Sequence, residues 1–461
     1  MASNEPGAGS GTATESESSA GTSKVKLARN MSGALLFFYV LGDVLGSGIY
    51  ALIGLVAGEV GGAFWTAFAL GIAVALITGL AYAELVTRYP VAAGAALYIA
   101  KAFKNQFFTF VVTFCMLAAI VSASGALALT FGGEYFKEFF DWPTLAVAVA
   151  FVAVLSLVNY RGISETAKSN AVMTLVEVSG LLIVLATGVA VVVTGDAKYE
   201  QVVDFKGEGS IALAILGGAA LSFFAMTGFE NAANVAEETR NATKVFPKAL
   251  LGGMATAGVL YILVAISTAL VADYDSIAGS EGALLEVVKQ GPFGIPPWLF
   301  AAIALVAVTN TCLVTMVTQS RILYGMANED VVPQVFAKVH PKRRTPWVGI
   351  LFTFIMVVGL LLVAGAEVAT LASASVVFLL FIYGLVIISA LKLRGDDEHP
   401  DASFHAPTVL LYVGLLGNAG LLFYTIQDDP SLLLYCGGLL AVGLVLYGVH
   451  RLAGQRSSTA G

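Results

Sequence analysis

Long apolar runs separated by short polar joints dominate the chain. A run of about 20 residues, rising about 1.5 Å per residue as a helix, is long enough to cross a bilayer. The pattern therefore predicts an all-α polytopic membrane protein with 12 transmembrane helices. The predicted spans are residues 33–59, 63–83, 107–131, 143–160, 171–194, 211–236, 249–272, 298–322, 347–365, 368–391, 407–425 and 431–450.

The first predicted span is interrupted at its centre. Within Leu41–Tyr50 lie three glycines and Asp43, residue types that helix propensity and hydrocarbon both disfavour. Backbone can unwind at membrane depth only where protein or a water-filled cavity receives the freed N–H and C=O groups. We therefore predict a broken helix whose break faces a binding site.

The sixth span carries a second interruption. Within Phe223–Asn231, a glycine is followed by Glu230 and an amide, deep in an otherwise apolar run. Interrupted helices at corresponding positions in two halves of a chain point to an inverted-repeat transporter with its site near the bilayer midplane. The two breaks, five helices apart, predict two five-helix repeats of opposite orientation.

Composition narrows the class further. The 461 residues are 58% hydrophobic and 12% charged, against roughly 25% charged in soluble chains, and the mean hydropathy is +0.85. There is no basic stripe, so no nucleic-acid partner is expected. The three cysteines are dispersed in apolar runs and the four histidines are scattered, which predicts neither a disulfide framework nor a metal site.

The placement of positive charge predicts the orientation. With the N-terminus inside, 20 of the 24 Lys and Arg residues fall in cytoplasmic segments. The outer loops hold only Lys137, Lys198, Lys206 and Lys289. The positive-inside rule then places both termini in the cytoplasm of a protein of the cytoplasmic membrane.

Four stretches resemble those of the amino acid–polyamine–organocation (APC) superfamily. They are Gly46–Ile49; Tyr82–Leu85 with Arg88–Pro90 and Gly94; Thr227–Glu230 with Glu237, Glu238, Asn241 and Pro247; and Gln319–Ala327 with Pro333, Val339–Pro341, Thr345 and Pro346. The likeness covers about residues 30 to 395. One departure is Ala95, which follows Gly94 where many members have a glutamate, so no role is assigned to it.

The resemblance implies a leucine-transporter-type 5+5 inverted repeat with discontinuous helices 1 and 6. It also implies secondary transport of amino acids or related amines by alternating access. The expected organisation is a disordered cytoplasmic tail (1–30), a ten-helix core (31–395, with repeats at about 31–194 and 211–391), two peripheral transmembrane helices (396–451) and a cytoplasmic tail (452–461).

The predicted substrate site lies between the two breaks. Unpaired amides where the first helix restarts, at Gly46, Ser47, Gly48 and Ile49, would bind a substrate carboxylate. Helix packing is the alternative explanation for these glycines. The resemblance makes Phe224 an aromatic gate over the substrate. The unwound backbone at Ala225, Met226, Thr227 and Gly228, together with Glu230, completes the predicted site.

The predicted coupling site centres on Glu177, an intramembrane carboxyl group in the fifth span. By the resemblance this helix lies near the first and eighth spans, where Thr311 and Thr315 would supply hydroxyls. Asp43 is a second candidate for coupling. A permanently protonated, hydrogen-bonded Glu177 and a bound sodium ion both stay open as alternatives to a carried proton.

We therefore expect a secondary amino acid transporter, with proton-coupled symport favoured over exchange. No cofactor is expected beyond the coupling proton or sodium. A membrane enzyme is disfavoured because no Cys, His or acid cluster shares one depth, whereas a non-transporting amino acid sensor stays open. With Glu230 as the one assured acid, a neutral substrate is favoured. The oligomeric state, monomer or homodimer, is left open.

Overall fold

The structure, a computed structural model, describes residues 31–91, 94–162, 167–206, 210–363, 367–395 and 402–458. Within these ranges the regular structure is helical, with one isolated parallel bridge between Met31 and Thr239. The predicted tail 1–30 lies outside the described residues. At the other end, helix α18 (Leu432–Ser458) extends past residue 450, where the last predicted span ends, into the predicted tail 452–461.

Ten helical segments in the described part of the chain are long and apolar enough to span a membrane. They are α3 (Trp65–Arg88), α5 (Gln106–Gly132), α7 (Thr144–Arg161), α8 (Ala167–Thr194), α10 (Ile211–Ala225) continued by η1 (Phe229–Glu238), α11 (Ala242–Val271), α14 (Pro297–Asn328), α16 (Val368–Lys392), α17 (Thr408–Asp428) and α18.

Two further segments affect the number of membrane spans in the structure. Helices α1 (Gly33–Val44) and α2 (Gly48–Val60) form a pair bent by 46°, which makes eleven spans if it counts as one. Helix α15 (Trp347–Val363) is apolar but has only 17 residues. A multi-pass helical membrane protein is thus confirmed, whereas the number 12 and the five-plus-five repeat stay predictions.

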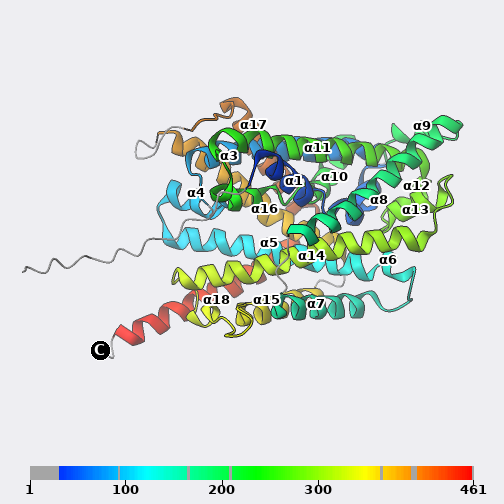
Figure 1. The fold of residues 1–461 in the computed structure, drawn as a ribbon. Coiled ribbons are helices and arrows are strands. Elements are labelled where there is room, and N and C mark those ends of the chain that lie inside the picture. Colours follow the sequence, from blue (N-terminus) through cyan, green and yellow to red (C-terminus); the bar gives the residue numbers. More distant parts are fainter. Residues whose placement is uncertain are drawn as a thin grey trace, which may run out of the picture.

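Short helices gather at the two ends of the bundle, where the long helices turn. We call the end that holds the start of α1 and the end of α14 the inner end, and the opposite one the outer end. The inner end carries α4 (Gly94–Phe103), η2 (Gln334–Ala337) and η3 (Leu393–Gly395); the outer end carries α6 (Glu134–Lys137), α9 (Tyr199–Val202), α12 (Tyr274–Ile277) and α13 (Ala283–Gln290). In Figure 1 the outer end is on the right.

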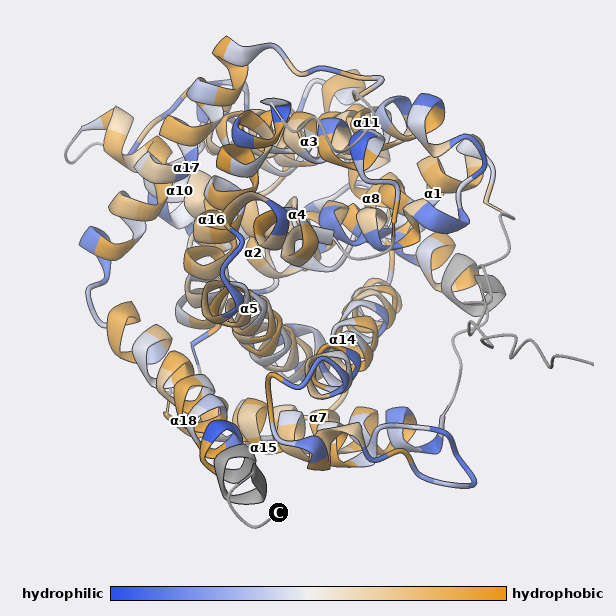
Figure 2. Ribbon diagram, turned by 90° about the vertical axis from the view of Figure 1, so that its left-hand side faces the viewer, coloured by the Kyte–Doolittle hydropathy of each residue, from blue (hydrophilic) through white to orange (hydrophobic). Residues whose placement is uncertain are grey.

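Viewed along the helix axes, α2, α4, α5 and α16 lie towards the interior and α7, α15, α17 and α18 towards the periphery (Figure 2). Close packing in the interior depends on small residues. A methyl group on Gly79 of α3 would lie 2.7 Å from the sulfur of Met254 on α11. The peripheral helices instead expose large apolar side chains such as Leu434, which suits contact with lipid.

A buried ion pair joins three helices at the inner end. The Glu84 carboxylate of α3 accepts two hydrogen bonds from Arg394 of η3, both 2.7 Å long. It also accepts one from the main-chain N–H of Ala406, just before α17. Glu84 is only 2% exposed, so this bidentate pair is a structural tie between α3, the end of α16 and the start of α17.

At the outer end, the turn between α12 and α13 is hydrogen-bonded to α2. The N–H of Gly279 donates to the carbonyl of Gly54 at 2.8 Å. A Cβ atom on Gly54 would lie 2.2 Å from the carbonyl oxygen of Ser280, and one on Gly58 would lie 2.9 Å from the nitrogen of Gly279. Gly54 and Gly58 are therefore packing glycines that let this outer turn lie directly against α2.

The same turn brings two carboxyl groups together. The hydroxyl of Ser280 donates to the Glu134 carboxylate of α6 at 2.9 Å, and Glu281 follows directly. Burial and the negative charge of Glu134 raise the pKa of Glu281 to about 7, and Lys137 opposes the shift. Glu281 is thus protonated in the folded protein over a pH range in which an exposed carboxyl group is ionised.

This pair predicts a pH-dependent stability. Since the unfolded chain releases the Glu281 proton near pH 4.5 and the folded protein holds it until about pH 7, stability falls as the pH rises through this interval. Glu281→Gln should raise the melting temperature of the detergent-purified protein at pH 8 by about 3 °C. At pH 5 it should have little effect.

Glu200→Gln is the matched control, because Glu200 lies exposed on α9 at the same end of the bundle. It should leave the melting temperature unchanged at both pH values. An equal melting temperature of Glu281→Gln and the unsubstituted protein at pH 8 would contradict the assignment.

Candidate functional site

The break between α1 and α2 is held open by side chains from other helices. Helix α1 ends at Val44 and α2 begins at Gly48. The Val44 carbonyl accepts a hydrogen bond from the hydroxyl of Tyr261 on α11, at 2.5 Å. The N–H of Ser47 donates to Oγ1 of Thr311 on α14, at 3.1 Å. Groups that an unbroken helix would pair internally thus find partners in the surrounding protein.

The second break follows α10, which ends at Ala225. Gly228 has a φ angle of 111°, a left-handed conformation that favours glycine. Its N–H donates to Oε2 of Glu230 at 2.9 Å, and the chain then continues as the 3₁₀ helix η1. The Glu230 side chain therefore caps the backbone of its own break.

The two breaks touch one another. A Cβ atom on Gly228 would lie 2.7 Å from the main-chain oxygen of Asp43, and one on Gly48 would lie 2.7 Å from Cα of Ala225. Asn231 Nδ2 also donates to Oδ2 of Asp43 at 3.1 Å. The broken segments of the first and sixth predicted spans thus form one contiguous unit.

A cavity of about 170 Å³ lies against this unit. Drug-sized ligands occupy pockets of roughly 300 Å³ or more, so this volume suits a smaller molecule. Its lining residues are Tyr39, Gly42, Asp43, Ala119, Ile120, Ala123, Thr227, Gly228, Glu230, Asn231, Asn310, Thr311, Val314, Thr315, Thr318, Ser375 and Leu379. They come from α1, α5, the second break, α14 and α16.

The lining is rich in hydrogen-bonding groups. It combines two carboxyl groups, two amides and several hydroxyls with a few apolar side chains, and none of the lining residues is Lys, Arg, His or Cys. In the described part of the chain, no group of three or more His, Cys, Asp or Glu residues could hold a metal ion. The cavity can therefore bind a small polar molecule through hydrogen bonds and charge.

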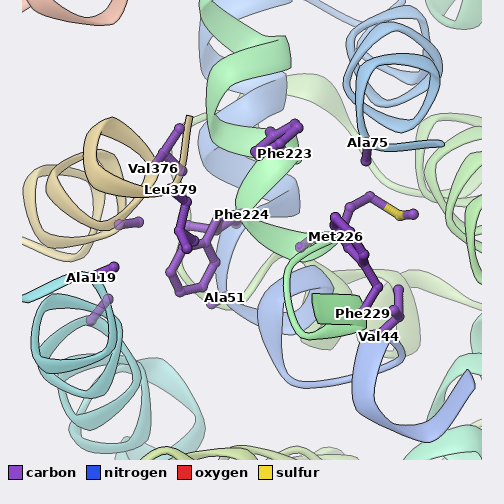
Figure 3. Close-up of a cluster of buried hydrophobic side chains, with 14 of the residues drawn as sticks. Val44, Ala51, Ala75, Ala119, Phe223, Phe224, Met226, Phe229, Val376 and Leu379 are labelled. Atoms are coloured by element: carbon purple, nitrogen blue, oxygen red, sulfur yellow. The ribbon is translucent and has the colours of Figure 1, made fainter. Parts of the chain in front are cut away.

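Six of the residues predicted from the sequence line the cavity, namely Asp43, Thr227, Gly228, Glu230, Thr311 and Thr315. The others, Gly46, Ser47, Gly48, Ile49, Phe224, Ala225, Met226 and Glu177, do not. Phe224 lies beside the lining residue Leu379 in Figure 3. The roles predicted for all of these residues stay predictions.

The cavity also includes residues that sequence reasoning did not place in it. Thr318 continues the polar face of α14 that Thr311 and Thr315 begin, so helical spacing is a signal that was available. Asn231 directly follows Glu230 in the second break. The residues from α5 and α16, by contrast, are small or apolar except for Ser375, and nothing in their pattern marks them as lining a site.

Glu177 lies level with the first break but outside the cavity. On the same face of α8, Thr174 approaches Gly42 of α1 and Gly180 approaches the Tyr50 hydroxyl of α2. The Tyr50 hydroxyl donates to the main-chain oxygen of Glu177 at 2.6 Å. Glu177 therefore lies between the levels at which α8 meets α1 and α2.

The Glu177 carboxyl group is fully buried, and neither of its oxygens has a hydrogen-bond partner among the described residues. The hydroxyl of Thr311 instead accepts from Ser47, and that of Thr315 is hydrogen-bonded to Ser124 at 2.9 Å. A buried, unpaired carboxylate is costly, so burial favours either the protonated form or a bound cation.

Comparison with known proteins connects this geometry to a family. A family model described as "Amino acid permease" matches residues 34–431. The chain is similar to an uncharacterized transporter of Mycobacterium tuberculosis, with 28% identity over 425 residues that cover 90% of each chain.

Two further relatives are named for the substrates that they transport. A branched-chain amino acid permease of Bacillus subtilis is 25% identical over 418 residues, covering 86% of this chain and 88% of that protein. A chloroplastic cationic amino acid transporter of Arabidopsis thaliana is 28% identical over 345 residues, covering 69% of this chain and 59% of that protein.

The contact between Gly48 and Ala225 predicts the effect of a single methyl group. In Gly48→Ala the new Cβ would meet main-chain atoms that cannot rotate away. Overpacking of this kind costs about 1–3 kcal/mol, so the melting temperature of the purified protein should fall. If instead Gly48 is needed only to let a ligand reach the backbone, Gly48→Ala would weaken ligand binding. The melting temperature of the ligand-free variant would then equal that of the unsubstituted protein.

Gly359→Ala is the control substitution. Gly359 lies in α15, and a Cβ atom there meets nothing within 4 Å. Its melting temperature should stay the same or rise slightly, because alanine restricts the unfolded chain.

Proposed function

The chain belongs to the amino acid permease family, and on that premise we propose that it is a secondary active transporter of amino acids in the cytoplasmic membrane. The observation that carries this proposal is the polar cavity where two broken helical segments meet. Broken helices meeting near mid-membrane are the usual construction of substrate sites in secondary transporters. In the proposed orientation both termini face the cytoplasm.

The common part of an amino acid has two charges, and the breaks offer partners for both. Helix α2 begins without a side-chain cap, and Ser47 at its start is hydrogen-bonded to the lining residue Thr311. In this proposal the first amides of α2 and its dipole favour a carboxylate from beside the cavity. Main-chain carbonyls at the ends of α1 and α10 are acceptors for an α-ammonium group. In this proposal Phe224, which lies beside the lining residue Leu379, closes over the bound molecule.

In this proposal, alternating access changes the angle between α1 and α2, or between α10 and η1. The first break then supplies a hinge, since Ser47 there donates its N–H to Thr311 on α14 and not to its own segment. The bonds that cross from Ser47 to Thr311 and from Asn231 to Asp43 are side-chain bonds, which can break and re-form as the halves rock.

We assign proton coupling to Glu177. Its burial without a partner favours the neutral acid, and a shift of α8 against α1 that admits water would favour release of the proton. Thr311 and Asp43, on the neighbouring helices, would transmit this change to the cavity. A sodium ion held by the Glu177 carboxylate is the competing assignment.

The test uses purified protein in liposomes and each standard amino acid as probe. An inward proton gradient should drive uptake. With one proton carried per substrate, the ratio of inside to outside substrate concentration at equilibrium should rise about tenfold for each pH unit of the gradient. Glu177→Gln should abolish this stimulation, because the amide cannot carry a proton. Glu200→Gln, which replaces an exposed carboxyl group on α9, should retain it.

Other outcomes contradict particular parts of the proposal. Full pH dependence in Glu177→Gln would overturn the proton assignment, and loss of uptake when choline replaces sodium would favour sodium coupling. Uptake only into preloaded vesicles would indicate an exchanger. Binding of an amino acid without any flux would indicate a sensor.

A further inference from the structure

Two neighbouring cavities lie at the inner end of the bundle, and neither shares a lining residue with the cavity at the breaks. The corner cavity, of about 240 Å³, lies between the corner that joins α4 to α5 and the end of α14. The apolar cavity, of about 230 Å³, lies between the first turns of α5 and the middle of α18. Phe110 of α5 lines both, so one side chain separates them.

The corner cavity carries opposite charges on two of its sides. Lys104 lines it from the corner between α4 and α5, and Glu329 lines it from the end of α14. Among the described residues, neither side chain takes part in an ion pair. The uncharged polar side chains of the lining are Asn105, Gln106, Thr109 and Thr113. A ligand that carries both a positive and a negative group would therefore find a partner for each.

The apolar cavity has no polar side chain in its lining, which consists of Phe107, Phe110, Val111, Phe114, Leu440, Gly443 and Leu444. A Cβ atom on Gly443 would lie 2.5 Å from Cδ1 of Phe114, so α18 lies directly against that ring. Phe107 and Leu444 are exposed, and the cavity therefore opens on an apolar surface of the bundle. A hydrocarbon chain is the occupant that such a lining favours.

The two cavities lie at different depths in the membrane. The residues that line the apolar cavity belong to the segments Gln106–Lys137 and Leu432–Leu452, which are both long and apolar enough to span a bilayer. Lys104 precedes the first of these segments, and Glu329 directly follows α14. The corner cavity is thus at the level of the lipid headgroups, and the apolar cavity lies where the hydrocarbon begins.

The charges of the corner cavity discriminate between phospholipid headgroups. Every phospholipid has a phosphate that Lys104 attracts. Phosphatidylglycerol has no positive group, so the Glu329 carboxylate repels it. Phosphatidylcholine is positively charged but its quaternary nitrogen has no N–H group to donate. Phosphatidylethanolamine has an ammonium group, which combines charge with hydrogen-bond donors and so makes the strongest pair with a carboxylate.

We propose that the corner cavity and the apolar cavity together bind one molecule of an aminophospholipid. Its ammonium group binds the Glu329 carboxylate, its phosphate lies beside Lys104, and one of its acyl chains lies in the apolar cavity. The lipid then joins the inner ends of α5 and α14 to α18, which lies at the periphery of the bundle (Figure 2). Since α5 and α14 also line the cavity at the breaks, the lipid stabilises two of its walls.

The experiment uses purified protein in detergent, from which lipid has been removed. Dioleoyl phosphatidylethanolamine, phosphatidylcholine and phosphatidylglycerol are titrated separately, and the melting temperature is measured. A ligand of the folded state raises it in proportion to its affinity and concentration. Phosphatidylethanolamine should act at a concentration about fivefold lower than the other two, which is what one exposed charge pair contributes. Glycerophosphoethanolamine, the headgroup without acyl chains, should have no effect at these concentrations.

Two charge variants test the headgroup contacts. Glu329→Gln should remove the preference for phosphatidylethanolamine over phosphatidylglycerol, because it abolishes attraction and repulsion together. Lys104→Gln should weaken all three lipids by a similar factor and leave the preference in place. The matched controls are Glu200→Gln on α9 and Lys244→Gln on α11, which also replace exposed charges. Neither control should change the affinity or the preference.

A third variant tests the acyl-chain contact. Leu444→Trp places a larger side chain at the opening of the apolar cavity and should weaken all three lipids. Leu433→Trp, at an exposed position of the same helix outside the cavity, is its control and should leave them unchanged. Both charge variants replace exposed side chains, so they test the site even if Leu444→Trp does not fold.

Four outcomes would overturn the proposal. One is an equal effect of the three lipids on the unsubstituted protein, and another is a headgroup preference that survives in Glu329→Gln. An effect of glycerophosphoethanolamine as large as that of the lipid would indicate a soluble ligand. A homodimer that Leu444→Trp dissociates, without any effect of lipid, would place a second copy of the chain against the apolar cavity. Because no readout depends on transport, each of these results leaves the proposed function untouched.

Discussion

Main-chain amides and carbonyls at membrane depth need partners inside the protein, and this requirement shapes the centre of the molecule. A helix that stops at Val44 and restarts at Gly48 leaves polar groups that lipid cannot satisfy. Tyr261, Thr311 and Glu230 satisfy such groups at the two breaks. Two of these residues, Thr311 and Glu230, also line the cavity, so stability and ligand binding share some of their hydrogen bonds.

A sequence reveals the residues of such a site only where their type differs from that of the apolar residues around them. Asp43 and Glu230 stand out because charged residues are rare in apolar spans, and both line the cavity. Ala119 and Leu379 also line it, yet small and apolar residues occur throughout every span, so no local pattern distinguishes them. The walls contributed by α5 and α16 could be located only once the helices were placed in space.

The role of a glycine in a membrane span also could not be predicted from the sequence. A glycine in a membrane span serves either close packing or close approach of a ligand, and the sequence reads the same in both cases. Gly48 lies against the backbone of Ala225, and Gly54 against Ser280. The distances that decide between the two uses arise from tertiary structure. The same holds for Glu84, whose burial depends on η3 turning back towards α3.

The contact of Gly279 with Gly54 has a consequence for how this protein could be held in one state. Because it joins backbone to backbone, neighbouring side chains of the outer turn can vary without breaking it. The turn and α2 are therefore expected to move together. An antibody fragment that binds the exposed residues of the turn between α12 and α13 would then restrain α2 from the end of the bundle, without entering the cavity.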